Sequence, residues 1–189
     1  MKNGVFLFLV LYAVERVIET FWKRTKSEGI IVARYSLPLI LSAYVFFYLV
    51  IFWEWSRLAG PELRPALVMI GMFAVIASVV GRNWAIKTLG VYHSIHVEIR
   101  DRHQLIQSGP YRYVRNPYYL SNAIEAMGLL LVVRSRVALL TVVFVYIPLL
   151  VHRLLVEENA LNKKFDGLFD EYTKHVPRIV PKLRSAGTN

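Results

Sequence analysis

The apolar residues of this chain gather in long blocks that few polar residues interrupt. Each block is long enough for a helix to cross a hydrocarbon core of roughly 30 Å. The blocks lie at about Val5–Phe21, Ile31–Trp53, Pro65–Ala85, Tyr118–Val133 and Val137–Val156. The pattern predicts an all-α, polytopic membrane protein with about five transmembrane helices.

The first and last blocks differ from the others. The first contains Glu15, Arg16 and Glu19, which we expect close enough to an interface for their side chains to reach water. It has no small-residue cleavage site after its apolar part, which favours a retained helix over a signal peptide. Only residues 134–136 separate the last two blocks, which predicts an antiparallel helical hairpin. The final helix should continue beyond the membrane, since no Gly or Pro follows before Gly167.

Charge supports this interpretation and gives the helices an orientation. Only 19% of the residues are charged, against roughly 25% in an average soluble domain. If the spans alternate, most Lys and Arg fall on one face, around residues 23–34, 82–115 and the C-terminal tail. The positive-inside rule makes that face cytoplasmic and the N-terminus extracytoplasmic. Attraction to anionic lipid then accounts for the net charge of +10 without a nucleic-acid partner.

Two polar segments, residues 81–117 and 157–189, lie on the predicted cytoplasmic face. They are too short for a separate catalytic domain with a large core. Neither has a glycine-rich turn between a strand and a helix, which excludes a doubly wound nucleotide-binding domain. A cofactor would therefore bind against the helix ends. We divide the chain into N-terminal membrane helices (1–86) and a loop, hairpin and tail (87–189), expected to form one structural unit.

Polar residues within the fourth block are candidate site residues. Ser121, Asn122 and Glu125 are spaced by three or four residues and share one helix face. An ionisable residue in a span is by default a functional candidate that faces the bundle interior. We therefore predict Asn122 and Glu125 as substrate-contacting residues. The alternative is a Glu that is neutralised or paired for packing alone.

Two further groups of polar residues have competing interpretations. His93 and His96 have a spacing that suits two metal ligands on one helical turn, but the chain has only five histidines, so we assign no metal site. Glu157 and Glu158 follow the last block. Glu157 could form an i,i+4 pair with Arg153, or both could begin a solvated helix. Adjacent carboxylates at a membrane boundary are costly unless a cationic group meets them, which favours a binding site.

Several motifs together point to a family. The loop contains "TLGVY" (88–92), "DRHQL" (101–105) and "GPYRYVRNPYYL" (109–120), and the tail contains Glu157–Glu158 and "DEYTKHVPRIVP" (170–181). These segments resemble the two-part motif of the isoprenylcysteine carboxyl methyltransferase family, a Gly-Pro-Tyr and Arg-His-Pro loop with a Glu-Glu pair and a Tyr-rich tail. The resemblance covers about residues 82–181, roughly half of the chain.

The resemblance implies an integral membrane methyltransferase with its active site on the cytoplasmic face. Such an enzyme moves a methyl group from S-adenosylmethionine to a lipophilic acceptor that enters from the bilayer, such as a prenylcysteine carboxylate. Relatives methylate alkyl-phenolic lipids, phospholipid amines or small thiols, so the acceptor stays open. Membrane lipids are the other expected partners.

Two alternatives remain open at this point. Membrane reductases of the sterol-reductase kind share a similar hairpin and loop but bind NADPH, whose 2′-phosphate could meet Lys163, Lys164 and Arg178. The chain could also be a catalytically inactive interaction protein, although an intact loop motif together with the Glu pair argues against it.

The family's site residues transfer to matching positions of this chain. Arg115 would anchor the acceptor or cofactor, and Glu157 would act with it in catalysis. The implied cofactor-binding residues are His103, Leu105, Gly109, Pro110, Tyr111, Asn116, Pro117, Tyr118, Tyr119, Glu158 and Asn162. Asn116 departs from the family, which has His there. An Asn side chain donates and accepts hydrogen bonds but does not titrate, so we predict recognition rather than proton transfer.

Overall fold

The computed structural model describes residues 2–22, 29–57, 64–99 and 104–181. Helices dominate it, which confirms the predicted all-α class. They are α1 (Lys2–Trp22), α2 (Ser36–Arg57), α3 (Pro65–Leu89), α4 (Pro117–Val133), α5 (Arg136–Thr141), α6 (Ile147–Phe165) and α7 (Gly167–His175). The short elements are β1 (Ile30–Ile31), η1 (Gly90–Tyr92), β2 (Glu98–Ile99), η2 (Gly109–Arg112) and the π-helical turn η3 (Val142–Tyr146).

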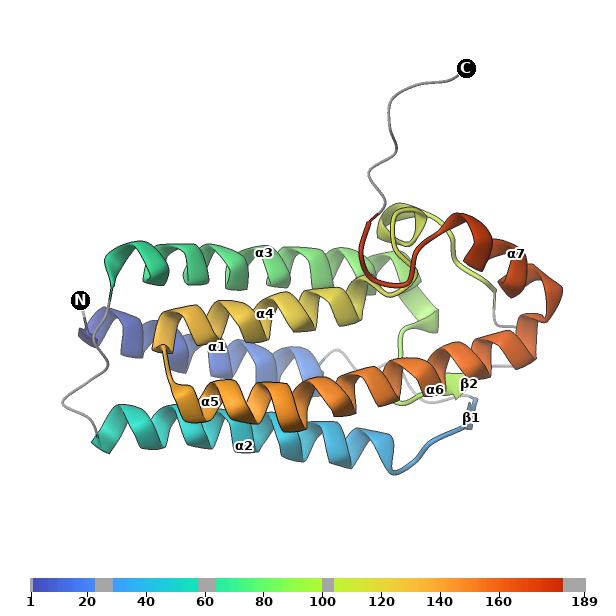
Figure 1. The fold of residues 1–189 in the computed structure, drawn as a ribbon. Helices are drawn as coiled ribbons and strands as arrows, with labels where there is room; N and C mark the ends of the chain where they lie inside the picture. Colours follow the sequence, from blue (N-terminus) through green and yellow to red (C-terminus); the bar gives the residue numbers. More distant parts are fainter. Residues whose placement is uncertain (1, 23–28, 58–63, 100–103, 182–189) are drawn as a thin grey trace, which may run out of the picture.

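The long helices run roughly parallel to one another in a bundle (Figure 1). α1 begins, and α4 ends, at one end of the bundle. The segment between α3 and α4, the β1–β2 pair and α7 lie at the other end, which we call the loop end. The sequence predicted this separation, since it placed residues 82–115 and the tail on the same face.

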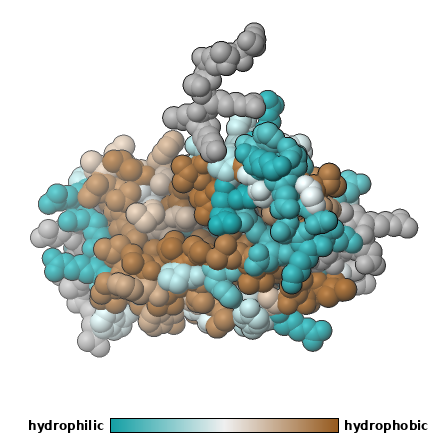
Figure 2. Space-filling view, turned by 45° about the vertical axis from the view of Figure 1, so that its right-hand side comes forward, coloured by the Kyte–Doolittle hydropathy of each residue, from teal (hydrophilic) through white to brown (hydrophobic). Residues whose placement is uncertain are grey.

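Length and composition make this an integral membrane protein. Three described helical stretches are long and apolar enough to cross a membrane, Ser36–Ser56, Pro65–Tyr92 and Arg136–Phe165. α4 is a shorter apolar helix, and α1 carries three charged residues near its middle and end. Large apolar side chains such as Met69, Phe73 and Phe144 are exposed on the helices. Figure 2 shows apolar side chains over the helical body, many hydrophilic ones toward the loop end and a smaller hydrophilic group at the opposite end.

α3 and α4 pack closely because glycines meet where they cross. A Cβ added to Gly71 would lie 2.6 Å from the carbonyl oxygen of Gly128, and one added to Gly128 would lie 2.8 Å from that of Gly71. Small residues allow membrane helices to approach in this way. The same close packing brings Arg82 on α3 to Glu125 on α4.

α5, η3 and α6 form one continuous helix from Arg136 to Phe165. The π-helical turn ends two residues before Pro148, whose ring and missing N–H disturb a regular helix. At 1.5 Å per residue, Glu157 lies about 32 Å along this helix, close to the thickness of a hydrocarbon core. The predicted continuation of the last helix past Val156 is confirmed, since α6 ends at Phe165 and carries Glu157 and Glu158 to the loop end.

A two-stranded antiparallel pair ties together the segments that precede α2 and follow α3. Ile30 pairs with Ile99 and Ile31 with Glu98, and the Val32 N–H donates to the Val97 carbonyl at 2.9 Å. The Glu98 carboxylate accepts from the Gly29 N–H at 2.8 Å. This pair holds residues 93–98 beside α6 at the loop end, where they form part of the site described next.

Candidate active site

The loop before α4 has a fixed shape. Gly109 has a φ of +58°, and a Cβ there would lie 2.7 Å from Oγ1 of Thr88, so both backbone and space require glycine. Pro110 and Tyr111 are buried, and the Tyr172 hydroxyl on α7 donates to the Tyr111 carbonyl at 2.5 Å. Burial raises the pKa of Tyr172 far above its usual value, so this donor stays protonated. α7 therefore clamps the loop against the bundle.

The segment after α7, residues 176–180, forms a strap across the start of α4. The Arg115 N–H donates to the Pro177 carbonyl at 2.9 Å, and the Asn116 N–H donates to the Arg178 carbonyl at 3.2 Å. The side-chain amide of Asn116 also donates to this Arg178 carbonyl, at 3.2 Å. Asn116 thus joins the loop to the strap through both its backbone and its side chain.

Glu158 is held at the centre of this junction. Its Oε1 accepts from Nδ2 of Asn116 at 2.7 Å, and its Oε2 accepts from Nε of Arg178 at 2.8 Å. Nε of Arg115 lies 3.5 Å from Oε1. That Nε is buried and has no hydrogen-bond partner among the described residues. The site therefore combines a carboxylate that is already bound with an arginine that has donor capacity left.

Glu157 points to a different partner. The Tyr119 hydroxyl donates to its Oε2 at 2.6 Å. Arg153, the sequence-based candidate for an ion pair with Glu157, instead donates to Oγ of Ser36 at 3.2 Å and to the carbonyl of Ile95. Arg153 thus fixes the start of α2 and the loop, while Glu157 and Glu158 approach two different residues of the α4 segment.

A cavity of about 160 Å³ lies among these groups. Nine of the predicted site residues line it: Leu105, Tyr111, Arg115, Asn116, Tyr118, Tyr119, Asn122, Glu157 and Glu158. His93 and His96 also line it, and the His93 ring lies tilted against Tyr118 with ring centroids 5.8 Å apart. The loop, α4, α6 and α7 therefore converge on one space, as the family motif implies.

The other predicted site residues lie elsewhere. Gly109 and Pro110 begin η2 and Pro117 begins α4, and none of the three lines the cavity. Asn162 is exposed on α6, beyond Glu158. His103 lies outside the described residues. The roles proposed for these positions stay predictions.

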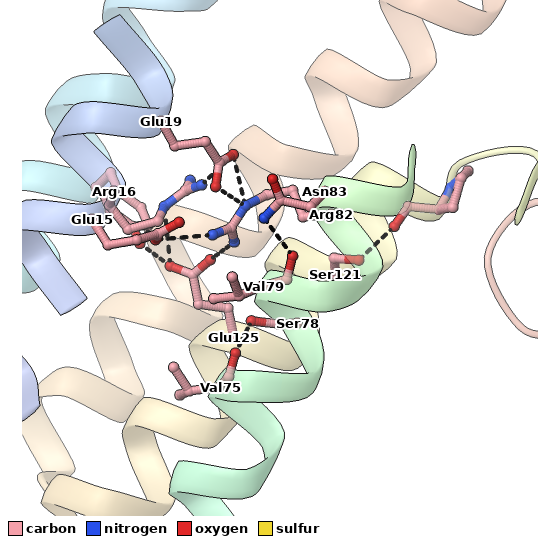
Figure 3. A network of polar contacts seen from close by, with 12 residues as sticks. Glu15, Arg16, Glu19, Val75, Ser78, Val79, Arg82, Asn83, Ser121 and Glu125 are labelled. Atoms are coloured by element: carbon pink, nitrogen blue, oxygen red, sulfur yellow. Dashed lines mark hydrogen bonds and ion pairs between the residues drawn. The ribbon is translucent and has the colours of Figure 1, made fainter. Parts of the chain in front are cut away.

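Glu125 belongs to an ion cluster between α1, α3 and α4, shown in Figure 3. Nε of Arg82 donates to both oxygens of Glu19, at 2.8 and 2.7 Å, and its Nη1 donates to Oε2 of Glu125 at 2.5 Å. Nη1 of Arg16 donates to Glu19 at 3.2 Å, and the Tyr44 hydroxyl donates to Oε1 of Glu125. Glu125 faces the bundle interior as predicted. The expectation that Arg16 and Glu19 reach water is wrong, since both are buried and find opposite charges inside.

The sequence reasoning missed the contribution of α1 and α2 to the cavity. Arg16 and Thr20 on α1 and Tyr44 on α2 line it, as do the apolar residues Leu37, Ile40, Leu41 and Leu150. The family motif does not cover these helices. The available signal was Arg16 itself, because an ionisable residue within a span is a functional candidate by default.

The fold and site define a class: a polytopic membrane protein with a cavity that both charged and apolar side chains line. A family model described as the isoprenylcysteine carboxyl methyltransferase (ICMT) family matches residues 69–163. The chain belongs to this family.

Relatives are distant. The chain is 27% identical over 128 residues to the cobalt-zinc-cadmium resistance protein CzcN of Cupriavidus metallidurans, covering 68% of this chain and 55% of that protein, so it spans about half of that relative. It is 26% identical to the uncharacterized protein YpbQ of Bacillus subtilis, over 83% of this chain and 96% of that protein. It is 25% identical to protein-S-isoprenylcysteine O-methyltransferase A of Arabidopsis thaliana, over 94% of this chain and 88% of that protein.

Proposed function

We propose that this protein is a membrane methyltransferase that moves a methyl group from S-adenosylmethionine to the carboxylate of a lipophilic acceptor of the prenylcysteine kind. The observation that carries the proposal is one cavity lined by both charged and apolar side chains. Arg115, Glu157 and Glu158 supply charge, and leucine and isoleucine side chains of α2 and α6 supply apolar wall. A polar cofactor and a hydrocarbon chain need such a combination in one space.

The residues present fit S-adenosylmethionine. Its amino group and ribose hydroxyls match carboxylates such as Glu157 and Glu158. Its carboxylate matches the buried Nε of Arg115, which has no hydrogen-bond partner among the described residues. Tyr111 and Tyr118 offer aromatic walls for adenine. When bound, S-adenosylmethionine would supply a methyl group on a sulfonium: a carboxylate oxygen forms the new O–C bond as the C–S bond breaks, which yields an ester and a neutral thioether.

The chain's own residues then have to position the acceptor against the cofactor, and they do not have to move protons. A carboxylate acceptor with a pKa near 4 is already ionised at neutral pH, so no general base is needed. The protein must hold the acceptor oxygen within about 3–3.5 Å of the methyl carbon and exclude water. The strap of residues 176–180 and the clamp by Tyr172 support such a closed site, because both bind the loop through its backbone.

We place the active site on the cytoplasmic face and the N-terminus on the other. The support is the sequence, in which most basic residues fall in the segments 23–34, 82–115 and the C-terminal tail. Accessibility tags at residues 1 and 189 test this arrangement in intact cells. Labelling from opposite sides is expected, and labelling from the same side would contradict it.

Titration of purified protein with S-adenosylmethionine and, separately, with NADPH tests the proposed cofactor. Binding of S-adenosylmethionine without NADPH is the expected result. Binding of NADPH alone would favour a reductase, and binding of neither would favour an interaction protein without catalytic activity.

A further inference from the structure

Arg115 and Glu158 carry opposite charges and lie close together, yet no hydrogen bond joins them. Nε of Arg115 is 3.5 Å from Oε1 of Glu158 and has no hydrogen-bond partner among the described residues. The two side chains are only 11% and 7% exposed. A buried guanidinium and a buried carboxylate attract each other strongly, so a shorter, hydrogen-bonded contact is expected unless other groups prevent it.

Asn116 and Arg178 are the groups that hold Glu158 away from Arg115. Nδ2 of Asn116 donates to Oε1 at 2.7 Å, and Nε of Arg178 donates to Oε2 at 2.8 Å. Nδ2 of Asn116 also donates to the Arg178 carbonyl at 3.2 Å. Asn116, Glu158 and Arg178 come from the loop, α6 and the strap, and each binds the other two. This closed ring fixes both oxygens of Glu158.

Arg178 reaches Glu158 from outside the cavity. It is not among the residues that line the cavity, unlike Glu158, and 51% of its side chain is exposed. Its backbone is bound separately, because its carbonyl accepts from the Asn116 N–H and the Pro177 carbonyl accepts from the Arg115 N–H. The side chain can therefore leave Glu158 for water while the strap stays in place.

Burial decides what the loss of Arg178 would do. A half-exposed ion pair is weak, because water competes for both charges. An enclosed pair is held more firmly, since its separation leaves both charges unpaired in a low dielectric. Without Arg178, Glu158 would turn to Arg115, and a ligand that needs both side chains would first have to separate them. Arg178 thus keeps a cation and an anion available side by side.

A ligand that uses both charges must carry an anion and a cation on neighbouring atoms, which is the chemistry of an α-amino acid. Its carboxylate would accept from Nε of Arg115, and its ammonium group would replace Arg178 on Glu158. We propose that Arg178 is a positioning residue that keeps this zwitterion site open until the amino-acid part of the cofactor binds. The assignment rests on the proposed function and extends it to a residue that does not line the cavity.

Two ligands that differ in the amino-acid part test this role. S-Adenosylhomocysteine, the demethylated cofactor, carries the zwitterion, and 5′-methylthioadenosine has the same nucleoside and a thioether without it. In titration calorimetry, Arg178→Met should bind S-adenosylhomocysteine about tenfold more weakly and 5′-methylthioadenosine as the wild type does. A strap that had merely come loose would weaken both ligands. Arg178→Lys keeps the charge and a donor group, so it should recover most of the affinity.

A double variant shows whether Arg178 acts through Glu158. In Glu158→Gln, no carboxylate is left to turn to Arg115, so adding Arg178→Met should cause no further loss. Lys174→Met is the matched control, because it removes one positive charge from α7, where Lys174 pairs with Glu171 at 2.8 Å. It should leave the affinity for both ligands unchanged. Arg178→Gln gives the same comparison if the methionine variant does not fold.

The outcomes separate this inference from the proposed function. Unchanged or tighter binding of S-adenosylhomocysteine by Arg178→Met would overturn the inference alone. An equal loss for both ligands, or a further loss in the double variant, would do the same. A wild-type protein that binds neither S-adenosylmethionine nor S-adenosylhomocysteine would contradict the proposed function itself.

Discussion

Two charged clusters, one that lines the cavity at the loop end and one inside the bundle, are built from the same kinds of residue but in different surroundings. At the loop end, Glu158 binds Asn116 and the half-exposed side chain of Arg178. Inside the bundle, Glu125 and Arg82 are almost completely enclosed. Glu158 is buried, but its partner Arg178 is half-exposed, so Glu158 can exchange this partner for a ligand. Removal of one partner from a fully enclosed ion pair instead costs much of the folding free energy. The loop end therefore suits binding, and the ion cluster fixes α1 against α3 and α4.

Removal of Arg82 should have the largest effect. Arg82→Met leaves Glu19 and Glu125 enclosed without their main partner, which should cost about 3–5 kcal/mol of folding free energy. Thermal unfolding in detergent, followed by the loss of helical signal, measures this change.

Glu15→Gln is the control for this prediction. Glu15 lies 3.4 Å from Arg82 but keeps 36% of its side chain exposed, so its loss should cost less than about 1 kcal/mol. Equal destabilisation by the two variants would contradict the distinction between an enclosed cluster and its exposed edge.

Glu158→Gln should affect binding more than stability. The loss of a charge-assisted hydrogen bond is worth about 1.5–3 kcal/mol, so S-adenosylmethionine affinity should fall more than tenfold. Glu171→Gln serves as control, because Glu171 on α7 pairs with Lys174 and His175 at the surface. Titration of both variants measures the difference. Unchanged affinity in both Glu158→Gln and Glu157→Gln would remove these carboxylates from the site.

Variants of Asn116 distinguish a role in recognition from a role in proton transfer. Asn116→Leu removes the amide that binds Glu158 and the Arg178 carbonyl, so it should weaken S-adenosylmethionine binding by roughly 1–3 kcal/mol. Asn116→His should leave the protein active and add at most a titration near pH 6.5. Methyl transfer measured against pH, with cofactor affinity in parallel, tests both expectations. A large gain in turnover for the histidine variant would show that a proton-transferring group is missing here.

The sequence predicted the helices and the loop end well, for a physical reason. Long apolar blocks specify membrane helices almost by themselves, and the Gly109–Tyr119 motif marks a loop whose glycine and prolines fix its shape. The convergence of that loop with Glu157 and Glu158 followed from the family motif.

The contribution of α1 could not be predicted in the same way. Whether Arg16 reaches water or a buried carboxylate depends on how α1 packs against α3 and α4, and no local pattern encodes that contact. The partners of Glu125 come from positions 43 and 109 residues away in the chain, so only the folded bundle brings them together. Residues 176–180 likewise belong to a motif that the sequence shows. The hydrogen bonds that their carbonyl groups accept from the loop could not be predicted from it.

Transfer of a labelled methyl group tests the central claim most directly. Purified protein in lipid nanodiscs would be incubated with S-adenosylmethionine that carries a tritiated methyl group and with N-acetyl-S-farnesylcysteine, and the product would then be treated with base. The account predicts label in the lipid that base releases as methanol, the behaviour of a methyl ester, and a strong reduction in Arg115→Gln. Label that resists base, or no transfer at all while S-adenosylmethionine binds, would contradict a carboxylate acceptor in this cavity.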